Sequence, residues 1–417
     1  MKYGLIANKV DHSFSAEIHK KIFGYDYELK AITENELHIF LERREFSAIN
    51  VTIPYKESVI EHLDYVNQEA LDIGAVNTIV NVDNKLYGYN TDVLGLTALI
   101  ERNGIEIANK KVLVLGSGGT SKTACYVAKK LGCLEVYRVS RTARDGCIDY
   151  KKAILCHSDA DVIINTTPSG MYPDIYSSAV DINEFKALSA VVDVVYNPLK
   201  TKLVCDAEKM GVKAVGGLYM LVAQAAYAAE KFVNKTVSVD KIDEVFKDIY
   251  TAKQNIVLIG MPRSGKTSSG KIIAEQMKKT FVDTDEEIFK KYGKYPHEII
   301  IESGEKAFRD IESEVISEIA SMQGCVIATG GGAILRAENI DALRMNGLIC
   351  FLNRDIDSLT VSSDRPLSSS RDDLIKRYNE RYDIYCNSCD IRIECVDGVD
   401  NNAQALIKEI LNENSCN

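Results

Sequence analysis

Two glycine-rich turns constrain the fold of this chain more than any other feature. Residues 116–119 (GSGG) follow one apolar run, residues 260–267 (GMPRSGKT) follow another, and a helical pattern comes after each turn. A turn without Cβ atoms lets backbone N–H groups approach an anion, and the N-terminus of the next helix adds favourable partial charge. Each turn is therefore predicted to hold phosphate within an α/β fold.

Length and charge limit the classes of protein to consider. A chain of 417 residues exceeds what one hydrophobic core usually supports, so two or three domains are expected. The net charge of -10 argues against nucleic acid as a partner, because phosphate backbones are bound by accumulated Lys and Arg. No apolar run reaches the ~18 residues that span a bilayer, and no signal-peptide core opens the chain. We therefore expect a cytoplasmic protein that binds small molecules and no membrane; its oligomeric state is left open.

The order of apolar runs and helical patterns predicts three α/β segments. Residues 1–92, together with a helical stretch at about 220–248, form the first. Residues 93–219 form the second, whose continuous apolar strands are typical of a doubly wound parallel sheet. A polar stretch at 235–254 is expected to be a linker, and residues 255–417 suit one compact nucleotide-kinase domain.

The first glycine turn is similar to a dinucleotide-binding fingerprint. Gly116, Gly118 and Gly119 lie between a predicted strand and a predicted helix, although Ser121 replaces the Gly or Ala of the sixth position. An ordinary strand-to-helix turn is the alternative. Arg141 follows the next strand, where NAD sites usually carry an acidic residue, and a guanidinium there binds a 2′-phosphate in fork geometry. The pattern favours NADP, with a solvated surface arginine as the alternative.

The second turn has the G-x-x-x-x-G-K-[ST] pattern of nucleoside triphosphate loops. Its amides would wrap phosphate, Lys266 would reach the β- and γ-oxygens of ATP, and Thr267 would ligate Mg²⁺. Arg263 is unusual, because loops of this type usually have Gly there. We expect a side chain at this position to be tolerated only with a negative φ.

A pair of carboxylates follows the next predicted strand. Asp283 and Asp285 are two residues apart, so they share one face of an extended chain. An acidic helical pattern follows, and a helix N-cap is the simpler interpretation of Asp283. The two roles are compatible.

Residues 1–235 closely resemble shikimate dehydrogenase. The motifs that carry the resemblance occur in one order: HSFS (12–15), NVTIPYK (50–56), GAVNT (74–78), GYNTD (88–92), GSGGTSK (116–122), NTTPSGM (165–171), DVVYNP (193–198) and GGLYMLVAQAA (216–226). The resemblance implies a substrate-binding α/β domain followed by a Rossmann domain that binds NADP(H).

The same resemblance implies roles for single residues. Lys56 and Asp92 would be the catalytic pair, with Lys56 exchanging a proton at the carbonyl oxygen while hydride passes to or from nicotinamide. Positions matching substrate-binding residues are Ser13, Ser15, Thr52, Asn77, Tyr196 and Gln224. Positions matching cofactor-binding residues are Gly116, Ser117, Gly118, Gly119, Ser140, Arg141, Thr142, Met171, Gly217 and Met220. Ala16 stands where the family usually has Pro, and Arg144 lies one position from a common second basic residue, which weakens the preference for NADP over NAD.

Residues 255–395 resemble shikimate kinase and imply a P-loop kinase domain. The matching motifs are the second glycine turn, FVDTD (281–285), AFRDIE (307–312), GGG (330–332), DRPL (364–367) and ERYDIY (380–385). Lys266 and Asp285 would be catalytic, with Asp285 binding the ring hydroxyl and taking its proton, and Thr267 and Asp283 would hold Mg²⁺. Positions matching groups around the substrate are Arg309, Gly331, Gly332 and Arg381, and those matching nucleotide-binding groups are Gly260, Ser264, Gly265, Lys266, Thr267 and, from the lid, Arg365. The lid region 361–370 is short, which predicts unusual lid kinetics.

The two resemblances together predict a bifunctional enzyme. One half would reduce 3-dehydroshikimate with NADPH, and the other would phosphorylate shikimate with MgATP. One alternative is a quinate- or NAD-preferring dehydrogenase fused to the kinase. Another is a regulator that keeps both folds as metabolite sensors; the retention of Lys56, Asp92, Lys266, Asp283 and Asp285 argues against it.

Overall fold

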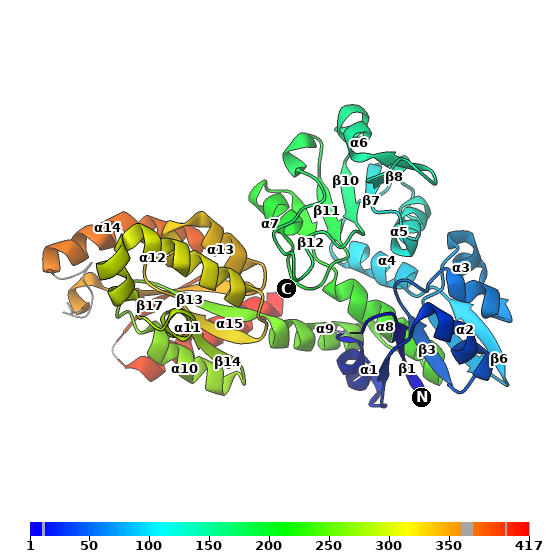
Figure 1. Ribbon diagram of the computed structural model, residues 1–417, viewed down its shortest axis with the longest axis horizontal. Coiled ribbons are helices and arrows are strands. Elements are labelled where there is room, and N and C mark those ends of the chain that lie inside the picture. The colour runs from blue at the N-terminus through cyan, green and yellow to red at the C-terminus, as the bar shows by residue number, and fades with distance from the viewer. Residues whose placement is uncertain (11–12, 360–369, 397, 417) are drawn as a thin grey trace. The chain divides into compact units, whose positions relative to one another are not determined.

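The chain folds into two compact units, Met1–Ile249 and Tyr250–Asn417, which are described separately (Figure 1). The computed structural model describes residues 1–10, 13–359, 370–396 and 398–416. The boundary falls within helix α9 (Val239–Lys253), which occupies most of the segment expected to be a linker. Ile242, Val245 and Ile249 of this helix are buried, because their spacing places them on one helical face.

The first sheet of the first unit is mixed, with strand order β2-β1-β3-β5-β6-β4, and β5 runs antiparallel to both β3 and β6. Its strands are β1 (Tyr3–Ala7), β2 (Glu28–Ala31), β3 (Ala48–Val51), β4 (Tyr65–Val66), β5 (Thr78–Val82) and β6 (Lys85–Tyr89). The helical elements between them are α1 (Ser15–Phe23), α2 (Glu34–Arg43), η1 (Ser58–His62) and α3 (Gln68–Ile73). Since β1 and β3 are parallel neighbours, the segments that follow them leave the sheet at the same edge.

The second sheet of this unit is parallel and has the strand order β12-β11-β10-β7-β8-β9. Its strands are β7 (Lys111–Leu115), β8 (Glu135–Ser140), β9 (Cys147–Asp149), β10 (Val162–Asn165), β11 (Ala190–Asp193) and β12 (Lys213–Val215). Its helical elements are α4 (Asp92–Arg102), α5 (Gly119–Lys130), α6 (Tyr150–His157), η2 (Ile182–Glu184) and α7 (Lys202–Lys209). The order reverses direction between β7 and β10, as in a Rossmann fold, and the predicted fold class is confirmed.

Helix α8 (Leu218–Val233) follows the second sheet and packs back against α1 and α4. Its Phe232 joins Leu5 and Tyr27 in a cluster on the first sheet. Against α4 the approach is close, because a Cβ on Gly95 would lie 2.7 Å from the Met220 carbonyl oxygen and 2.8 Å from Gln224 Cβ. Thus α8 fixes the position of α4, whose first residue is Asp92.

The second unit is a parallel sheet covered on both faces, with strand order β14-β15-β13-β16-β17. The strands are β13 (Asn255–Ile259), β14 (Thr280–Asp283), β15 (Cys325–Ala328), β16 (Gly347–Arg354) and β17 (Ile391–Cys395). The helical elements are α10 (Lys266–Gln276), α11 (Thr284–Tyr292), α12 (Pro296–Ala320), η3 (Ala333–Leu335), α13 (Ala337–Arg344), η4 (Ile356–Ser358), α14 (Arg371–Ser388) and α15 (Val399–Cys416). Alternate residues of β13 enter different cores: Val257 and Ile259 pack with α11 to α14, whereas Ile256 and Leu258 pack with α10 and α15.

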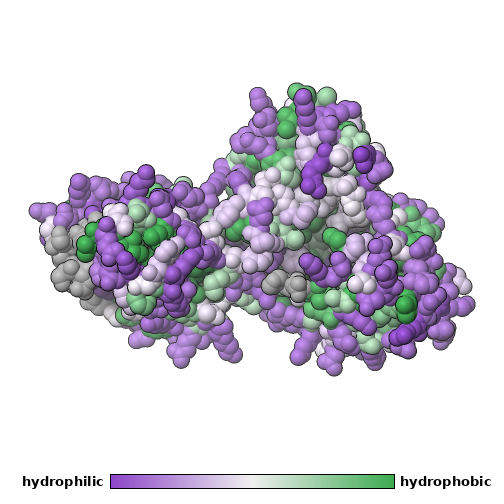
Figure 2. All heavy atoms as spheres, viewed as in Figure 1, coloured by the Kyte–Doolittle hydropathy of each residue, from purple (hydrophilic) through white to green (hydrophobic). Residues whose placement is uncertain are grey.

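Hydrophilic residues dominate the face seen in Figure 2, with hydrophobic residues in small areas between them. In the part of the chain that the structure describes, no helix combines the length and apolar character needed to cross a membrane.

Asp193 is a buried carboxyl group at the end of β11. It accepts hydrogen bonds from Asn165 Nδ2 (3.0 Å), Val195 N (3.0 Å) and Thr201 Oγ1 (2.6 Å), and so joins β10 to the start of α7. Burial nevertheless raises the pKa of Asp193 from 3.8 to about 6, against the opposing effect of these hydrogen bonds. The folded protein therefore binds a proton here at pH values where the unfolded chain has released it.

We expect Asp193→Asn to change how stability depends on pH. Because the folded pKa is raised, ionisation of Asp193 lowers the free energy of unfolding as pH rises from about 4 to 6, by on the order of 2–3 kcal/mol. The variant lacks this term, so its stability relative to wild type should rise by that amount over the same range. Urea unfolding followed by circular dichroism at several pH values measures the difference.

A matched control is Asp181→Asn, because a hydrogen bond from the Asn183 backbone lowers the pKa of this exposed carboxyl. Its difference from wild type should have the opposite sign and lie below pH 4. If Asp193→Asn and wild type change in parallel from pH 4 to 7, Asp193 is ionised throughout.

Candidate active sites

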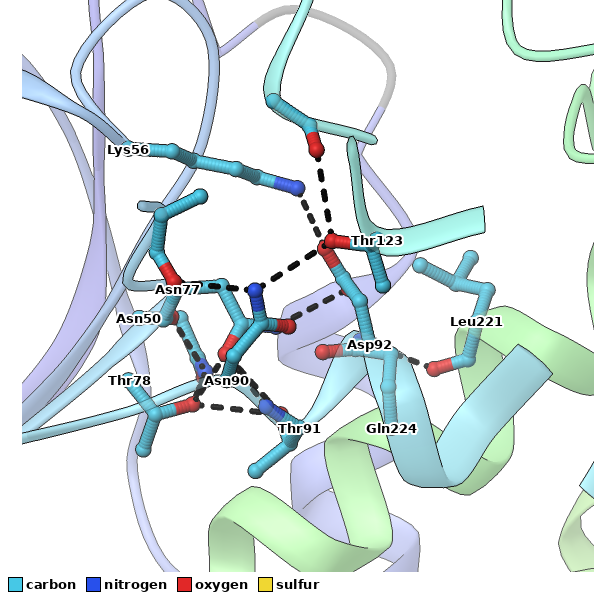
Figure 3. Close-up of polar contacts among 12 residues, drawn as sticks. Asn50, Lys56, Asn77, Thr78, Asn90, Thr91, Asp92, Thr123, Leu221 and Gln224 are labelled. Carbon is cyan, nitrogen blue, oxygen red and sulfur yellow. Dashed lines mark hydrogen bonds and ion pairs between the residues drawn. The ribbon is translucent and has the colours of Figure 1, made fainter. Parts of the chain in front are cut away.

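Lys56 and Asp92 form a largely buried ion pair in the first unit (Figure 3). Lys56 Nζ lies 2.5 Å from Asp92 Oδ2, and the two side chains are 13% and 8% exposed. The turn that carries Lys56 is anchored by its own backbone, since Lys56 O accepts from Val76 N at 2.7 Å, and by the buried Tyr55 hydroxyl, which donates to Ile32 O at 2.6 Å. Asp92 begins α4, where the helix dipole favours a negative charge.

Asn77 holds the other oxygen of Asp92. Its Nδ2 donates to Asp92 Oδ1 at 2.9 Å, while its Oδ1 accepts from Thr91 N at 2.8 Å and from Thr78 Oγ1 at 2.9 Å. Asn50 Nδ2 donates in turn to Asn77 O at 3.2 Å. These buried groups leave Asp92 one orientation, so Lys56 meets a carboxylate that is already in place.

The first glycine turn adjoins this pair. Gly116 has φ 125°, and a Cβ there would lie 2.4 Å from Thr166 Oγ1, so β7 and β10 approach closely at the point where the strand order reverses. A Cβ on Gly119 would lie 3.5 Å from Ala75 Cβ and 3.6 Å from Lys56 Cβ. The start of α5, with its free N–H groups, is therefore beside Lys56, which fits a dinucleotide cofactor whose reactive end reaches this lysine.

The other residues expected at the cofactor surround the ends of the parallel strands. Arg141 and Thr142 follow β8 directly and are exposed, and the Ser140 hydroxyl donates to the Thr142 carbonyl. Met171 is half-exposed, Gly217 is the N-cap residue of α8, and Met220 is buried against α4. Ser117 and Gly118 lie between Gly116 and α5.

The residues expected to bind substrate come from several segments. Ser13 Oγ accepts from Ser15 N at 3.3 Å, and the ring of Phe14, between these two serines, lies 5.3 Å from the ring of Tyr196. Thr52 follows β3, and its N–H donates to Ile6 O at the end of β1. Gln224 lies on α8, where it faces α4, and its Nε2 donates to Leu221 O at 2.9 Å.

The second glycine turn forms a ring around a lysine. Gly260 and Gly265 have φ values of 148° and 100°, and the Nζ of Lys266 donates to the carbonyls of Gly260 and Met261 at 2.9 Å each. Lys266 is 7% exposed, and Ser264 Oγ is buried without a hydrogen-bond partner among the described residues. The loop is thus preformed around a positive charge, which fits the phosphates of a nucleotide.

The expectation for the backbone at Arg263 was wrong. Its φ is 66°, in the left-handed region that favours glycine, and not negative. The loop therefore places an arginine in a conformation that favours glycine, at a cost of about 1–2 kcal/mol in backbone strain.

Oxygen ligands for a cation lie next to the loop. Thr267 Oγ1 donates to Asp283 Oδ2 at 2.8 Å, and Asp283 Oδ1 accepts from Asp285 N at 3.0 Å. Asp283 is therefore the N-cap of α11, as the simpler interpretation of the sequence predicts, and it also accepts from Thr267; its role as a magnesium ligand stays a prediction. A hydroxyl and a carboxylate are donors that suit Mg²⁺.

The glycine segment 330–332 contacts two arginines, Arg309 and Arg381. Arg309 Nη1 donates to the buried Glu312 at 2.6 Å, and Arg381 Nη1 and the Tyr385 hydroxyl donate to Gly331 O at 2.9 and 2.5 Å. Burial raises the pKa of Glu312, an effect that Arg309 opposes. A Cβ on Gly332 would lie 2.5 Å from Arg309 Cζ.

Some residues of these sites were missed by sequence reasoning, and one cannot be placed. Asn50, Glu312 and Tyr385 stand within quoted motifs, but nothing in the sequence shows that they are buried hydrogen-bond partners of site residues. Arg365 lies outside the described residues, as does most of the lid region.

Comparison with known proteins gives families for both units. Residues 5–79 match the shikimate dehydrogenase substrate binding domain, and residues 262–414 match shikimate kinase. A shikimate dehydrogenase (NADP(+)) of Clostridium perfringens is 38% identical over 265 residues, which cover 60% of this chain and 96% of that protein.

Solved structures similar to the first unit include a chorismate mutase/shikimate 5-dehydrogenase fusion protein from Clostridium acetobutylicum. It has a TM-score of 0.56 at 35% identity, covering 59% of this chain and 96% of that chain. The shikimate 5-dehydrogenase of Thermus thermophilus, in complex with NADP(H) and shikimate, has a TM-score of 0.54 at 29% identity, covering 60% of this chain and 99% of that chain.

The folds and sites define an enzyme that joins a dehydrogenase to a P-loop kinase. The chain belongs to the shikimate dehydrogenase family and carries a shikimate kinase domain after its dehydrogenase part. It is therefore a bifunctional enzyme of the shikimate pathway.

We expect Asn77→Asp to destabilise the first unit. The variant would place a carboxylate oxygen where Nδ2 now donates to Asp92 at 2.9 Å, so two buried like charges would face each other. We expect a loss of about 2–3 kcal/mol in unfolding free energy at pH 7, and a smaller loss at pH 5, where one carboxylate takes up a proton.

Equilibrium unfolding at the two pH values measures both effects. Asn84→Asp, which adds the same charge on an exposed turn, is the control and should change little. An equal loss for Asn77→Asp at both pH values would contradict a charge conflict with Asp92.

Proposed function

We propose that the first unit reduces 3-dehydroshikimate to shikimate with NADPH, and that the second transfers the γ-phosphoryl group of MgATP to the 3-hydroxyl of shikimate. The observation that carries this proposal is that each glycine turn adjoins the acid–base residues of its own unit. Gly119 lies against Lys56, and the loop around Lys266 lies beside Asp283. We also propose that residues 1–92 and about 220–248 bind the substrate, and that residues 93–219 bind the cofactor.

In the first unit the chemistry of this chain's own residues is proton transfer and positioning. NADPH, when bound, supplies hydride to the carbonyl carbon. The Lys56 ammonium stabilises the negative charge that develops on the carbonyl oxygen and gives it a proton. Asp92 and Asn77 hold the ammonium in place, while Ser13, Ser15 and their neighbours would bind the substrate carboxylate.

In the second unit the residues mainly position charge. MgATP, when bound, supplies the phosphoryl group; Lys266 would bind its β- and γ-oxygens, and Thr267 and Asp283 would hold the magnesium ion. Asp285 would accept the proton of the attacking hydroxyl. Arg309 and Arg381 would bind the shikimate carboxylate, and the buried Arg309 Nε, which has no hydrogen-bond partner among the described residues, supports this role.

We expect single substitutions to separate the two activities. Lys56→Ala should lower NADPH-dependent reduction about 10³-fold and leave shikimate-dependent ADP release unchanged, because it removes the proton donor of one unit only. Lys266→Ala should lower ADP release by a similar factor and leave reduction unchanged. Steady-state assays of both reactions on each full-length variant measure this.

The control is Lys130→Ala, which removes a half-exposed lysine paired with Glu69 and should change neither rate. Loss of both activities in either catalytic variant, with circular dichroism unchanged, would contradict independent sites. Full activity in Lys56→Ala would contradict the dehydrogenase proposal, and the sensor alternative requires that wild type catalyse neither reaction.

We expect Arg141 to determine the cofactor preference. Arg141→Ala should lower kcat/KM for NADPH about 10- to 100-fold and change kcat/KM for NADH little, because a charge-assisted hydrogen bond to the 2′-phosphate is lost. Rates with NADPH and NADH, and with quinate in place of shikimate in the reverse direction, test this and the quinate alternative. Lys151→Ala, exposed on α6, is the control; equal losses with both cofactors would contradict the assignment.

A further inference from the structure

Arg263 combines a strained backbone with a position at the tip of the phosphate-binding loop. Its φ of 66° is one that glycine adopts freely and that an arginine adopts only with strain. Non-glycine residues in this region persist where the surrounding structure holds them, and they cluster at functional sites.

The loop tip contacts the segment that carries the substrate side of the site. A Cβ on Gly331 would lie 2.7 Å from Pro262 Cδ, so Pro262, the residue before Arg263, packs against this glycine. A Cβ on the preceding Gly330 would lie 3.4 Å from Asp285 Oδ1. The backbone at Arg263 is therefore next to the point where the nucleotide loop meets the proposed hydroxyl-binding carboxylate.

The side chains of the loop alternate between the interior and the surface. Ser264 and Lys266 are buried, whereas Arg263 is exposed. Lys266 Nζ donates to two carbonyls of the loop, so its positive charge lies inside the loop. Arg263 is exposed on the same loop, so a guanidinium at this position can reach a bound phosphate from the solvent side.

The charge balance of the reaction favours a further cation at this place, besides Lys266 and the magnesium ion. Phosphoryl transfer spreads negative charge over the equatorial oxygens, and the acceptor here would be an anion beside the carboxylate of Asp285. Lysine supplies a point charge, but the planar fork of arginine can contact two of these oxygens at once.

We propose that Arg263 is a catalytic residue of the kinase unit, whose guanidinium contacts the phosphoryl group during its transfer; this rests on the proposed kinase function. The bond from phosphorus to the shikimate oxygen forms, the bond to the ADP oxygen breaks, and the hydroxyl proton goes to Asp285. Arg263 supplies charge and exchanges no proton.

Replacement of Arg263 by glycine distinguishes this role from a structural one. Because glycine removes the strain, Arg263→Gly should unfold about 2–4 °C higher than Arg263→Gln in the absence of ligands. Arg263→Gly should also unfold above wild type, whereas a loop arginine kept for stability would make both variants unfold below it. Activity should fall in both variants, so stability and rate move in different directions.

The experiment uses the full-length chain and compares wild type with Arg263→Gly, Arg263→Gln and Arg263→Lys. We expect the kcat of shikimate phosphorylation to fall about 10²-fold in the glycine and glutamine variants and less in the lysine variant, with KM for ATP and shikimate within about threefold. Binding of MgADP with aluminium fluoride and shikimate should weaken in parallel, while binding of MgADP alone should not. Dehydrogenase activity in each sample serves as the internal reference.

Lys278→Gly is the matched control, because Lys278 is another exposed basic residue with a positive φ, 54°, in the same unit. It should gain stability as Arg263→Gly does and keep wild-type kcat. A wild-type kcat in Arg263→Gln, or a loss confined to KM for ATP, would overturn the inference. A wild-type chain that forms no phosphorylated shikimate would instead overturn the proposed kinase function.

Discussion

Close backbone approach at positions without a side chain is the constraint on which both sites depend. At Gly116 the turn after β7 lies against Thr166, which follows the neighbouring strand β10, and at Gly331 the segment after β15 lies against Pro262. A Cβ at either position would push the two segments apart. Because parallel strands end at one edge of a sheet, these contacts gather residues from distant parts of the sequence around each phosphate-binding turn.

Each unit also buries charged side chains. These side chains are stabilised by ion pairs and by hydrogen bonds from neighbouring residues. Asp92 lies between Lys56 and Asn77, and Arg309 is held by Glu312. An isolated buried charge is costly, whereas a paired and hydrogen-bonded charge is stable and fixed in orientation. The same network that makes burial tolerable therefore positions the groups that we propose to meet the substrate, so that little reorganisation is needed on binding.

The fold and much of the two sites were open to prediction because local rules decide them. Strand–turn–helix patterns placed both glycine turns, and ordered motifs placed Lys56, Asp92 and Asp283. The hydrogen-bond network could not be predicted, because the burial of Asn50, Asn77 and Glu312 depends on strands and helices that are distant in sequence. The positive φ of Arg263 was also missed, since propensity favours the unstrained backbone and only the loop around Lys266 imposes the other one. The segment 235–254 was expected to be a linker, and most of it is helix α9, whose buried residues recur at helical spacing.

We propose that one chain carries two activities that act in sequence on the same oxygen atom. The most direct test supplies 3-dehydroshikimate, NADPH and MgATP to the full-length protein and follows nicotinamide oxidation together with the formation of shikimate 3-phosphate. We expect shikimate 3-phosphate to form in an amount that approaches the NADPH oxidised, and shikimate to be the product when ATP is omitted. Oxidation of NADPH without any phosphorylated product, or no oxidation at all, would contradict it.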